Sequence, residues 1–60
     1  MTTLTLHVIH RPTGDRRVSY TQEYADATTT DQLILCAETD GYAEHGQAHP
    51  AYLFAWWSEA

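Results

Sequence analysis

The sequence predicts a small α+β fold: a β-hairpin, then a helix, then a short C-terminal helix or strand (ββαα or ββαβ). Two observations support this prediction. Residues 3–24 contain two segments of alternating apolar and polar side chains joined by a turn sequence. Residues 29–41 carry helix start and stop signals around an apolar run. At sixty residues, the chain is expected to form one domain, 1–60, near the lower size limit for a single core.

The two predicted strands follow the period of a half-buried sheet. Residues 3–10 place Leu4, Leu6 and Val8 on one side of a strand and polar side chains on the other. Residues 16–24 repeat this alternation. Since an isolated hairpin is marginally stable, its apolar face must be covered by the residues that follow.

The turn between the strands predicts their register. Residues 12–14 are Pro-Thr-Gly, in which the proline favours the first central position of a turn and the glycine accepts a left-handed conformation. A three-residue loop at this place pairs Val8 with Val18 and Leu6 with Tyr20. A shift by one residue would put apolar and polar side chains on the same face, so turn and pattern agree.

A helix is expected to begin at Thr29. Thr29 as N-cap and Gln32 three residues later resemble a capping box. The helix should continue to about Asp40, with Gly41 as the left-handed residue that ends it. The alternative is a buried strand over residues 33–36, because short apolar runs are ambiguous by period.

The last ten residues contain the aromatic segment, residues 51–57, with the sequence Ala-Tyr-Leu-Phe-Ala-Trp-Trp. Pro50 suits the first position of a helix, whereas the aromatic residues are good strand formers. We expect a helix, with a strand as the alternative. Together these elements predict a core formed by Leu4, Leu6, Val8, Val18, Tyr20, Leu33, Ile34 and Cys36.

Charge is distributed unevenly along the chain, whose formal net charge is −5. Residues 1–22 contain all three arginines, and residues 23–60 contain seven carboxylates and no lysine or arginine. Binding to nucleic acid is driven by basic side chains that neutralise phosphates, so we expect no direct DNA or RNA binding. The absence of lysine and asparagine indicates a GC-rich genome, and we expect a phage-encoded protein.

The sequence indicates a cytoplasmic protein. The first residues lack the basic start and long apolar run of a secretory signal. Residues 52–57 are far fewer than the ~20 apolar residues that a membrane-spanning helix requires. Cys36 is the single cysteine, so an intrachain disulfide is excluded.

Cys36, His45 and His49 supply side chains of the kind that bind zinc. The two histidines are four residues apart, but Gly46 between them and Pro50 after them disfavour the helix that would place both on one face. We therefore predict no metal and no cofactor, and a small zinc-stabilised protein is kept as an alternative.

No enzymatic activity is expected. Glu44 with His45, or Cys36 with His45, could form an acid–base or nucleophile pair, but a short chain offers little concave, water-excluding space around them. The three glycines are separated and form no phosphate-binding loop.

These observations predict a small acidic accessory or regulatory protein that acts by contact with another protein or with a second copy of itself as a homodimer. The alternative is an acidic DNA mimic that inhibits a nucleic-acid-binding protein through Asp31, Glu38, Asp40 and Glu44. The predicted partner-binding residues are Tyr52, Phe54, Trp56, Trp57, Asp40 and Glu44.

Overall fold

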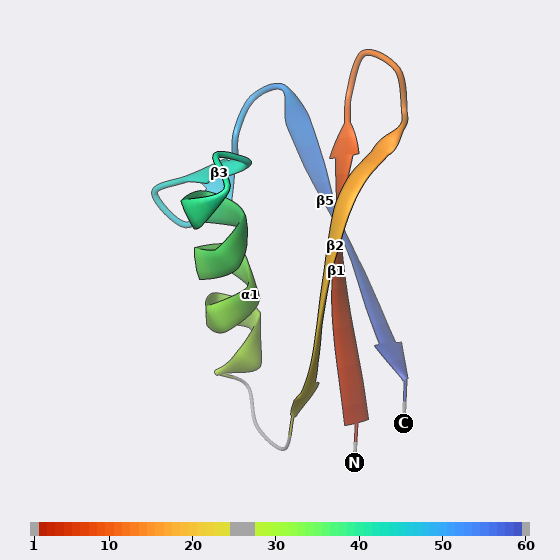
Figure 1. The fold of residues 1–60 in the computed structure, drawn as a ribbon, viewed down its shortest axis with the longest axis vertical. Coiled ribbons are helices and arrows are strands. Elements are labelled where there is room, and N and C mark those ends of the chain that lie inside the picture. Colours follow the sequence, from red (N-terminus) through yellow and green to blue (C-terminus); the bar gives the residue numbers. More distant parts are fainter. Residues whose placement is uncertain (1, 25–27, 60) are drawn as a thin grey trace.

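Three antiparallel strands and one helix form two layers in the computed structural model, which describes residues 2–24 and 28–59 (Figure 1). The elements in chain order are β1 (Thr2–His10), β2 (Arg16–Tyr24), α1 (Thr29–Thr39), β3 (Ala43–Glu44), β4 (Gln47–Ala48) and β5 (Tyr52–Glu59). The main sheet has the order β2-β1-β5, and β3 pairs with β4 in a second, two-stranded sheet. The α+β class with a ββαβ order of its main elements is confirmed.

The predicted hairpin register is also confirmed. Val8 pairs with Val18 and Leu6 with Tyr20, and the same register continues to the pair of Thr2 with Tyr24. Side chains opposite each other on neighbouring antiparallel strands lie on the same face, so the apolar residues of both strands gather on one side.

The connection between β1 and β2 is longer than the predicted three-residue loop. The His10 N–H donates to the Asp15 carbonyl at 2.8 Å, and the Gly14 N–H donates to the His10 carbonyl at 2.7 Å. Ile9 pairs with Arg16 while Val8 pairs with Val18, so one extra residue forms a β-bulge in β2. This bulge compensates for the added loop residue, which is why the register beyond it agrees with the prediction.

Helix α1 ends as predicted but begins differently. Gly41 has φ +86°, and the N–H groups of Gly41 and Tyr42 donate to the carbonyls of Glu38 and Ala37, which is a Schellman motif. At the other end, the N-cap is Thr28 rather than Thr29, so the predicted capping box is wrong. Thr29 is instead the first residue of α1 and is buried.

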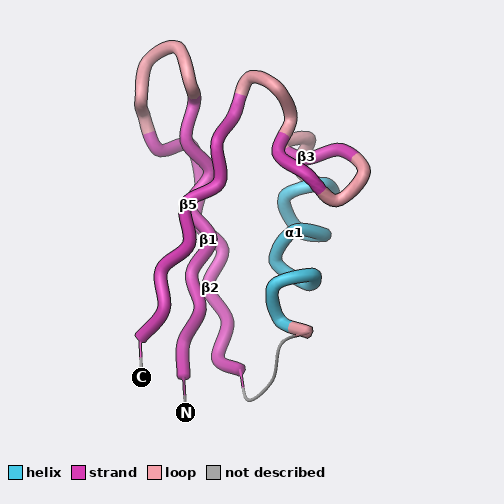
Figure 2. The backbone as a smooth tube through the Cα atoms, turned by 180° about the vertical axis from the view of Figure 1, so that it is seen from behind, coloured by secondary structure: helices cyan, strands magenta, loops and turns pink. Residues whose placement is uncertain are grey.

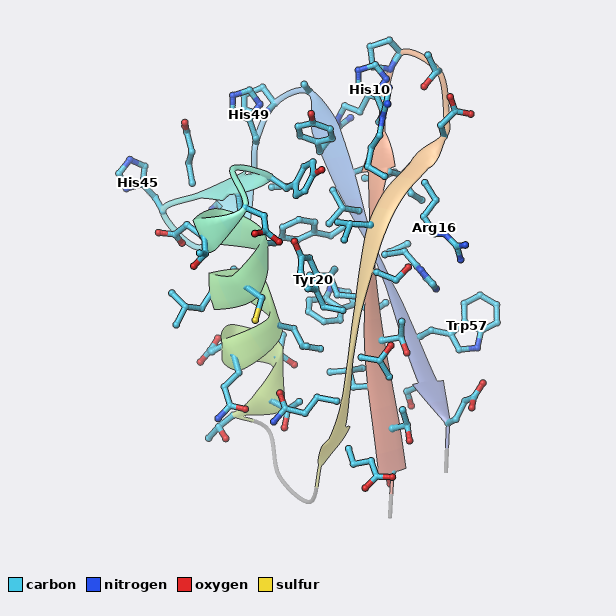
Figure 3. The ribbon with its side chains drawn as sticks, in the orientation of Figure 1. His10, Arg16, Tyr20, His45, His49 and Trp57 are labelled. Carbon is cyan, nitrogen blue, oxygen red and sulfur yellow. The ribbon has the colours of Figure 1, made fainter. Side chains whose placement is uncertain are left out.

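A small hairpin follows α1. β3 and β4 are joined by His45 and Gly46, which have φ values of +53° and +78°. Positive φ at both central positions is required by the two-residue turn that matches strand twist. The turn therefore places His45 at an exposed tip, away from the main sheet (Figure 3).

The aromatic segment is a strand and not the helix that we expected. β5 pairs with β1 in antiparallel orientation, from His10 with Tyr52 to Thr3 with Glu59. The strand propensity of the aromatic residues agrees with this pairing, which also satisfies the backbone groups along the second edge of β1. In Figure 2, seen from behind, β5 lies beside β1 and α1 lies on one side of the sheet only.

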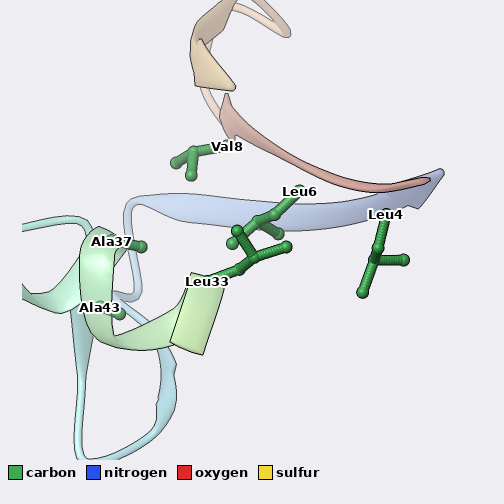
Figure 4. Packing of buried hydrophobic residues seen from close by; sticks show 6 residues of the cluster. All are labelled: Leu4, Leu6, Val8, Leu33, Ala37 and Ala43. Carbon is green, nitrogen blue, oxygen red and sulfur yellow. The ribbon is translucent and has the colours of Figure 1, made fainter. Parts of the chain in front are cut away.

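The core lies between α1 and this sheet (Figure 4). Helix residues spaced four apart face the sheet, and Ala37 is small enough for close approach of the helix. Tyr20, Val18 and Phe54 pack at the margin of the core, half-buried. The buried apolar residues are Leu4, Leu6, Val8, Leu33, Ala37 and Ala43.

Two residues of the predicted core do not belong to it. Cys36 is exposed and Ile34 is half-buried, because a single sheet beneath α1 buries only a narrow stripe of the helix. Ala37 takes the place predicted for Cys36, one residue further along the helix.

A side-chain hydrogen bond joins the sheet to the end of the helix. The Tyr20 hydroxyl of β2 donates to the Asp40 carboxylate at the C-cap of α1. Burial raises the pKa of Tyr20 above its ordinary value, and the hydrogen bond and negative charge of Asp40 raise it further. Tyr20 therefore stays protonated and able to donate throughout the neutral range.

We expect Tyr20→Phe to lower the free energy of unfolding by about 1 to 2 kcal/mol, since it removes a hydrogen bond to a charged acceptor. The pKa of Tyr20 is higher in the folded state, so this contribution is fully present below pH ~10 and is lost at higher pH. Denaturant titrations from pH 7 to 11 measure the difference. Tyr42→Phe is the matched control, because the described residues give its hydroxyl no hydrogen bond. Equal losses in the two variants would contradict the assignment.

Candidate functional site

The second face of the main sheet has no layer over it in the described part of the chain. α1 packs against β1 and β2 from one side (Figure 1). In Figure 3, Tyr20 points toward α1, whereas Arg16 and Trp57 point away from it. We call this second side the open face.

The open face is built from four cross-strand rows, each with one residue from β2, β1 and β5 in that order. Strand alternation sends the neighbours of Leu4, Leu6 and Val8 to this side. The rows are Glu23–Thr3–Glu59, Thr21–Thr5–Trp57, Ser19–His7–Ala55 and Arg16–Ile9–Leu53.

Exposed apolar side chains concentrate on β5. Trp57 and Leu53 on the open face are 61% and 45% exposed. Trp56, on the opposite side of the same strand, is 40% exposed, because α1 covers β2 and β1 rather than β5. The remaining large exposed hydrophobic side chain among the described residues is Leu35, at 62%, on α1.

Polar contacts fix the centre of the open face. His7 Nδ1 and Ser19 Oγ are 2.7 Å apart in a hydrogen bond, and the hydroxyls of Thr5 and Thr21 are 3.2 Å apart. The His7 and Trp57 rings meet edge to face, with centroids 6.4 Å apart. Trp57 thus contacts a neighbour that is itself hydrogen-bonded to β2.

The predicted partner-binding residues of the aromatic segment lie in two different environments. Tyr52 and Phe54 are half-buried and pack against the core, and the Tyr52 ring meets Tyr42 edge to face at 5.0 Å. Trp56 and Trp57 are exposed. His7 was not among the predicted site residues, although strand alternation places it on the side opposite the core.

The arginines at the hairpin end differ in their contacts. Arg11 Nε donates to the Tyr52 carbonyl at 3.0 Å, and Arg17 donates to His10 Nδ1 at 3.1 Å. The side chain of Arg16 has no hydrogen bond or ion pair within the described residues. Arg16 is thus the arginine whose guanidinium is available on the open face.

The predicted acidic residues lie on the other side of the molecule. Asp31 and Glu38 are exposed on α1, seven residues apart and hence on one helix face, and Glu44 is exposed in β3. Asp40 accepts the hydrogen bond of Tyr20. The structure therefore separates the acidic residues from the exposed tryptophan of the open face.

Cys36, His45 and His49 are not brought together. Within residues 2–24 and 28–59, no group of three or more His, Cys, Asp and Glu side chains is arranged to hold a metal ion. His49 Nδ1 instead accepts a hydrogen bond from the Ala51 N–H at 3.2 Å. No cavity is found among the same residues.

The described residues contain no helix with the length and apolar character needed to cross a bilayer. Comparison of the chain with protein-family models, with curated proteins and with solved structures gives no match.

We expect Cys36→Ser to change the free energy of unfolding by less than about 0.5 kcal/mol, because the side chain is exposed. The neighbouring change Ala37→Ser is the control, and burying its unpaired hydroxyl should cost about 1 to 3 kcal/mol. Thermal melts of both variants, with and without a chelator, make the comparison. Stoichiometric zinc in the purified protein, lost together with the fold in Cys36→Ser, would restore the zinc hypothesis.

Proposed function

We propose that this chain is a small protein-binding accessory or regulatory protein that contacts its partner through the open face. The observation that carries the proposal is the exposure of Trp57 and Leu53 on a sheet face without a covering layer in the described residues. Exposed apolar groups that cluster on one face are typical of interaction sites.

The chemistry of the open face supports a protein partner. Tryptophan and arginine are enriched among the residues that dominate binding energy, and Trp57 and Arg16 both project from this face (Figure 3). Threonine, serine and histidine side chains between them can exchange hydrogen bonds with a partner's polar groups.

The position of Trp57 on a paired strand also supports binding. Its backbone is fixed by pairing with Thr5, and its ring contacts His7. A side chain that is ordered before binding loses less conformational entropy on association. The paired backbone and the contact with His7 thus lower the cost of ordering Trp57 when a partner binds.

A second candidate is acidic mimicry of nucleic acid by the helix side. Its support is that Asp31 and Glu38 are exposed on one face of α1, without an ion pair among the described residues. Such binding would weaken steeply with salt, because it depends on charge. We rank it second because Trp57, the more exposed of the two tryptophans, lies on the opposite side of the molecule.

The test of the proposed function compares Trp57→Ala with Leu35→Ala, two side chains of nearly equal exposure on opposite sides. Tagged wild-type protein is used to capture partners, and each partner is purified and titrated against both variants. We expect Trp57→Ala to weaken binding by about 30-fold, as for a central anchor worth about 2 kcal/mol. Leu35→Ala should bind like wild type.

A purified partner that binds Trp57→Ala with unchanged affinity would remove the open face as the binding surface. If the same partner loses affinity when Asp31 and Glu38 are both neutralised, the acidic side is the contact. The cytoplasmic location and phage origin expected from the sequence stay predictions.

A further inference from the structure

The two ends of the open face carry opposite charges. Arg16 lies in the row that contains Ile9, and Glu23 and Glu59 lie in the row that contains Thr3. The two rows are six positions apart along β1, a distance of about 20 Å. None of these three charged side chains has an ion-pair partner within the described residues.

We infer that a second copy of this chain packs on the open face, related by a twofold axis that lies between the two sheets and perpendicular to the strands. The inference rests on the proposed function and names its partner. This axis reverses the strand direction and stacks each strand on its own copy. Arg16 of one copy then lies over Glu23 of the other, and the symmetry makes this contact twice.

The same axis matches side-chain size along β5. The row of Trp57 is placed over the row of Ala55, so the large indole ring of each copy meets the smallest side chain of the face in the other. Leu53 is placed over the aliphatic part of Glu59. Charge and volume are thus complementary under one operation.

The alternative twofold axis, parallel to the strands, lacks this complementarity. It would stack each row on itself and place Glu23 of one copy over Glu59 of the other. Like charges in close contact disfavour that arrangement. Stacked sheets normally cross at about 30°, and the long side chains of arginine and glutamate can span the resulting offset at the ends.

The size of the open face predicts a weak dimer. Three strands spaced about 4.8 Å apart and about 20 Å of strand length give a footprint well below the roughly 800 Å² per partner of a standard interface. We therefore expect a weak dimer that exchanges with monomer.

The first experiment is sedimentation equilibrium from 5 µM to 1 mM with wild type, Arg16→Glu, Glu23→Arg and the double variant. Each single change should weaken the dimer at least tenfold, because it creates two like-charge contacts. The double variant keeps the net charge, exchanges the two positions and should recover wild-type dimerisation. Glu38→Arg on α1 makes the same charge change as Glu23→Arg on the other side and should leave the dimer intact.

The second experiment uses cross-linking in a Cys36→Ser background. Its outcome does not depend on whether the double charge variant recovers dimerisation. Arg16→Cys and Glu23→Cys proteins are mixed and treated with a short bifunctional thiol reagent whose spacer covers the ~10 Å between stacked sheets, with circular dichroism to confirm that each is folded. The inferred symmetry predicts efficient cross-links in the mixture and few in either protein alone. Trp57→Ala should reduce them.

The inference is overturned if wild type stays monomeric to 1 mM. It is also overturned if wild type dimerises and neither Arg16→Glu nor Glu23→Arg changes the dissociation constant of the dimer. The latter outcome points to pairing through one of the edge strands of the main sheet, β2 or β5. In both of these outcomes, Trp57→Ala can still be tested against a different purified partner. If Trp57→Ala binds that partner more weakly than wild type, only the dimer is rejected and the proposed function stands. If neither self-association nor partner binding responds to Trp57→Ala, both are rejected.

Discussion

The central strand β1 holds the described fold together, because it is hydrogen-bonded along both edges and carries the two fully buried large side chains, Leu6 and Val8. β2 and β5 are attached to it and do not pair with each other. α1 covers the face on which Leu6 and Val8 lie. A single short strand thus organises both the sheet and the core.

The same arrangement limits what the chain can cover. An eleven-residue helix is about 16 Å long, whereas a nine-residue strand extends about 30 Å. α1 lies over β2 and β1, so the far side of β5 retains exposed Trp56. The open face, with Trp57, receives no cover from the described residues. The exposed surface that supports our proposals is present because α1 is too short and too narrow to cover the three-stranded sheet.

The parts of the fold that local chemistry specifies could be predicted from the sequence. The register of Val8 with Val18 follows from alternation, and the end of α1 follows from Gly41. The loop length differed, because a bulge can absorb one residue without disturbing the strands beyond it. Such compensation depends on hydrogen bonding between two strands, so the sequence of neither strand alone indicates it.

The features set by long-range packing could not be predicted. Whether residues 52–59 form a strand or a helix depends on the free edge of β1, which lies more than forty residues earlier in the chain. Cys36 and Ala37 are adjacent, and the rotation of α1 about its own axis decides which one is buried. For the candidate site, the sequence indicated the exposed tryptophans. That His7 and Arg16 lie on the same face as Trp57 follows from the strand order β2-β1-β5, which the sequence did not indicate.

The position of β5 has a consequence for how the protein folds. The contacts between β1 and β2 close a short loop, whereas the pairs from His10 with Tyr52 to Thr3 with Glu59 join residues separated by 42 to 56 positions. Closing a long loop costs more chain entropy, so the hairpin can form early and β5 docks late. On the ribosome, β1 therefore waits with one edge unpaired until the last strand has emerged. During that interval the nascent chain offers a free β-edge beside Leu6 and Val8, which is the surface that chaperones and aggregating chains recognise.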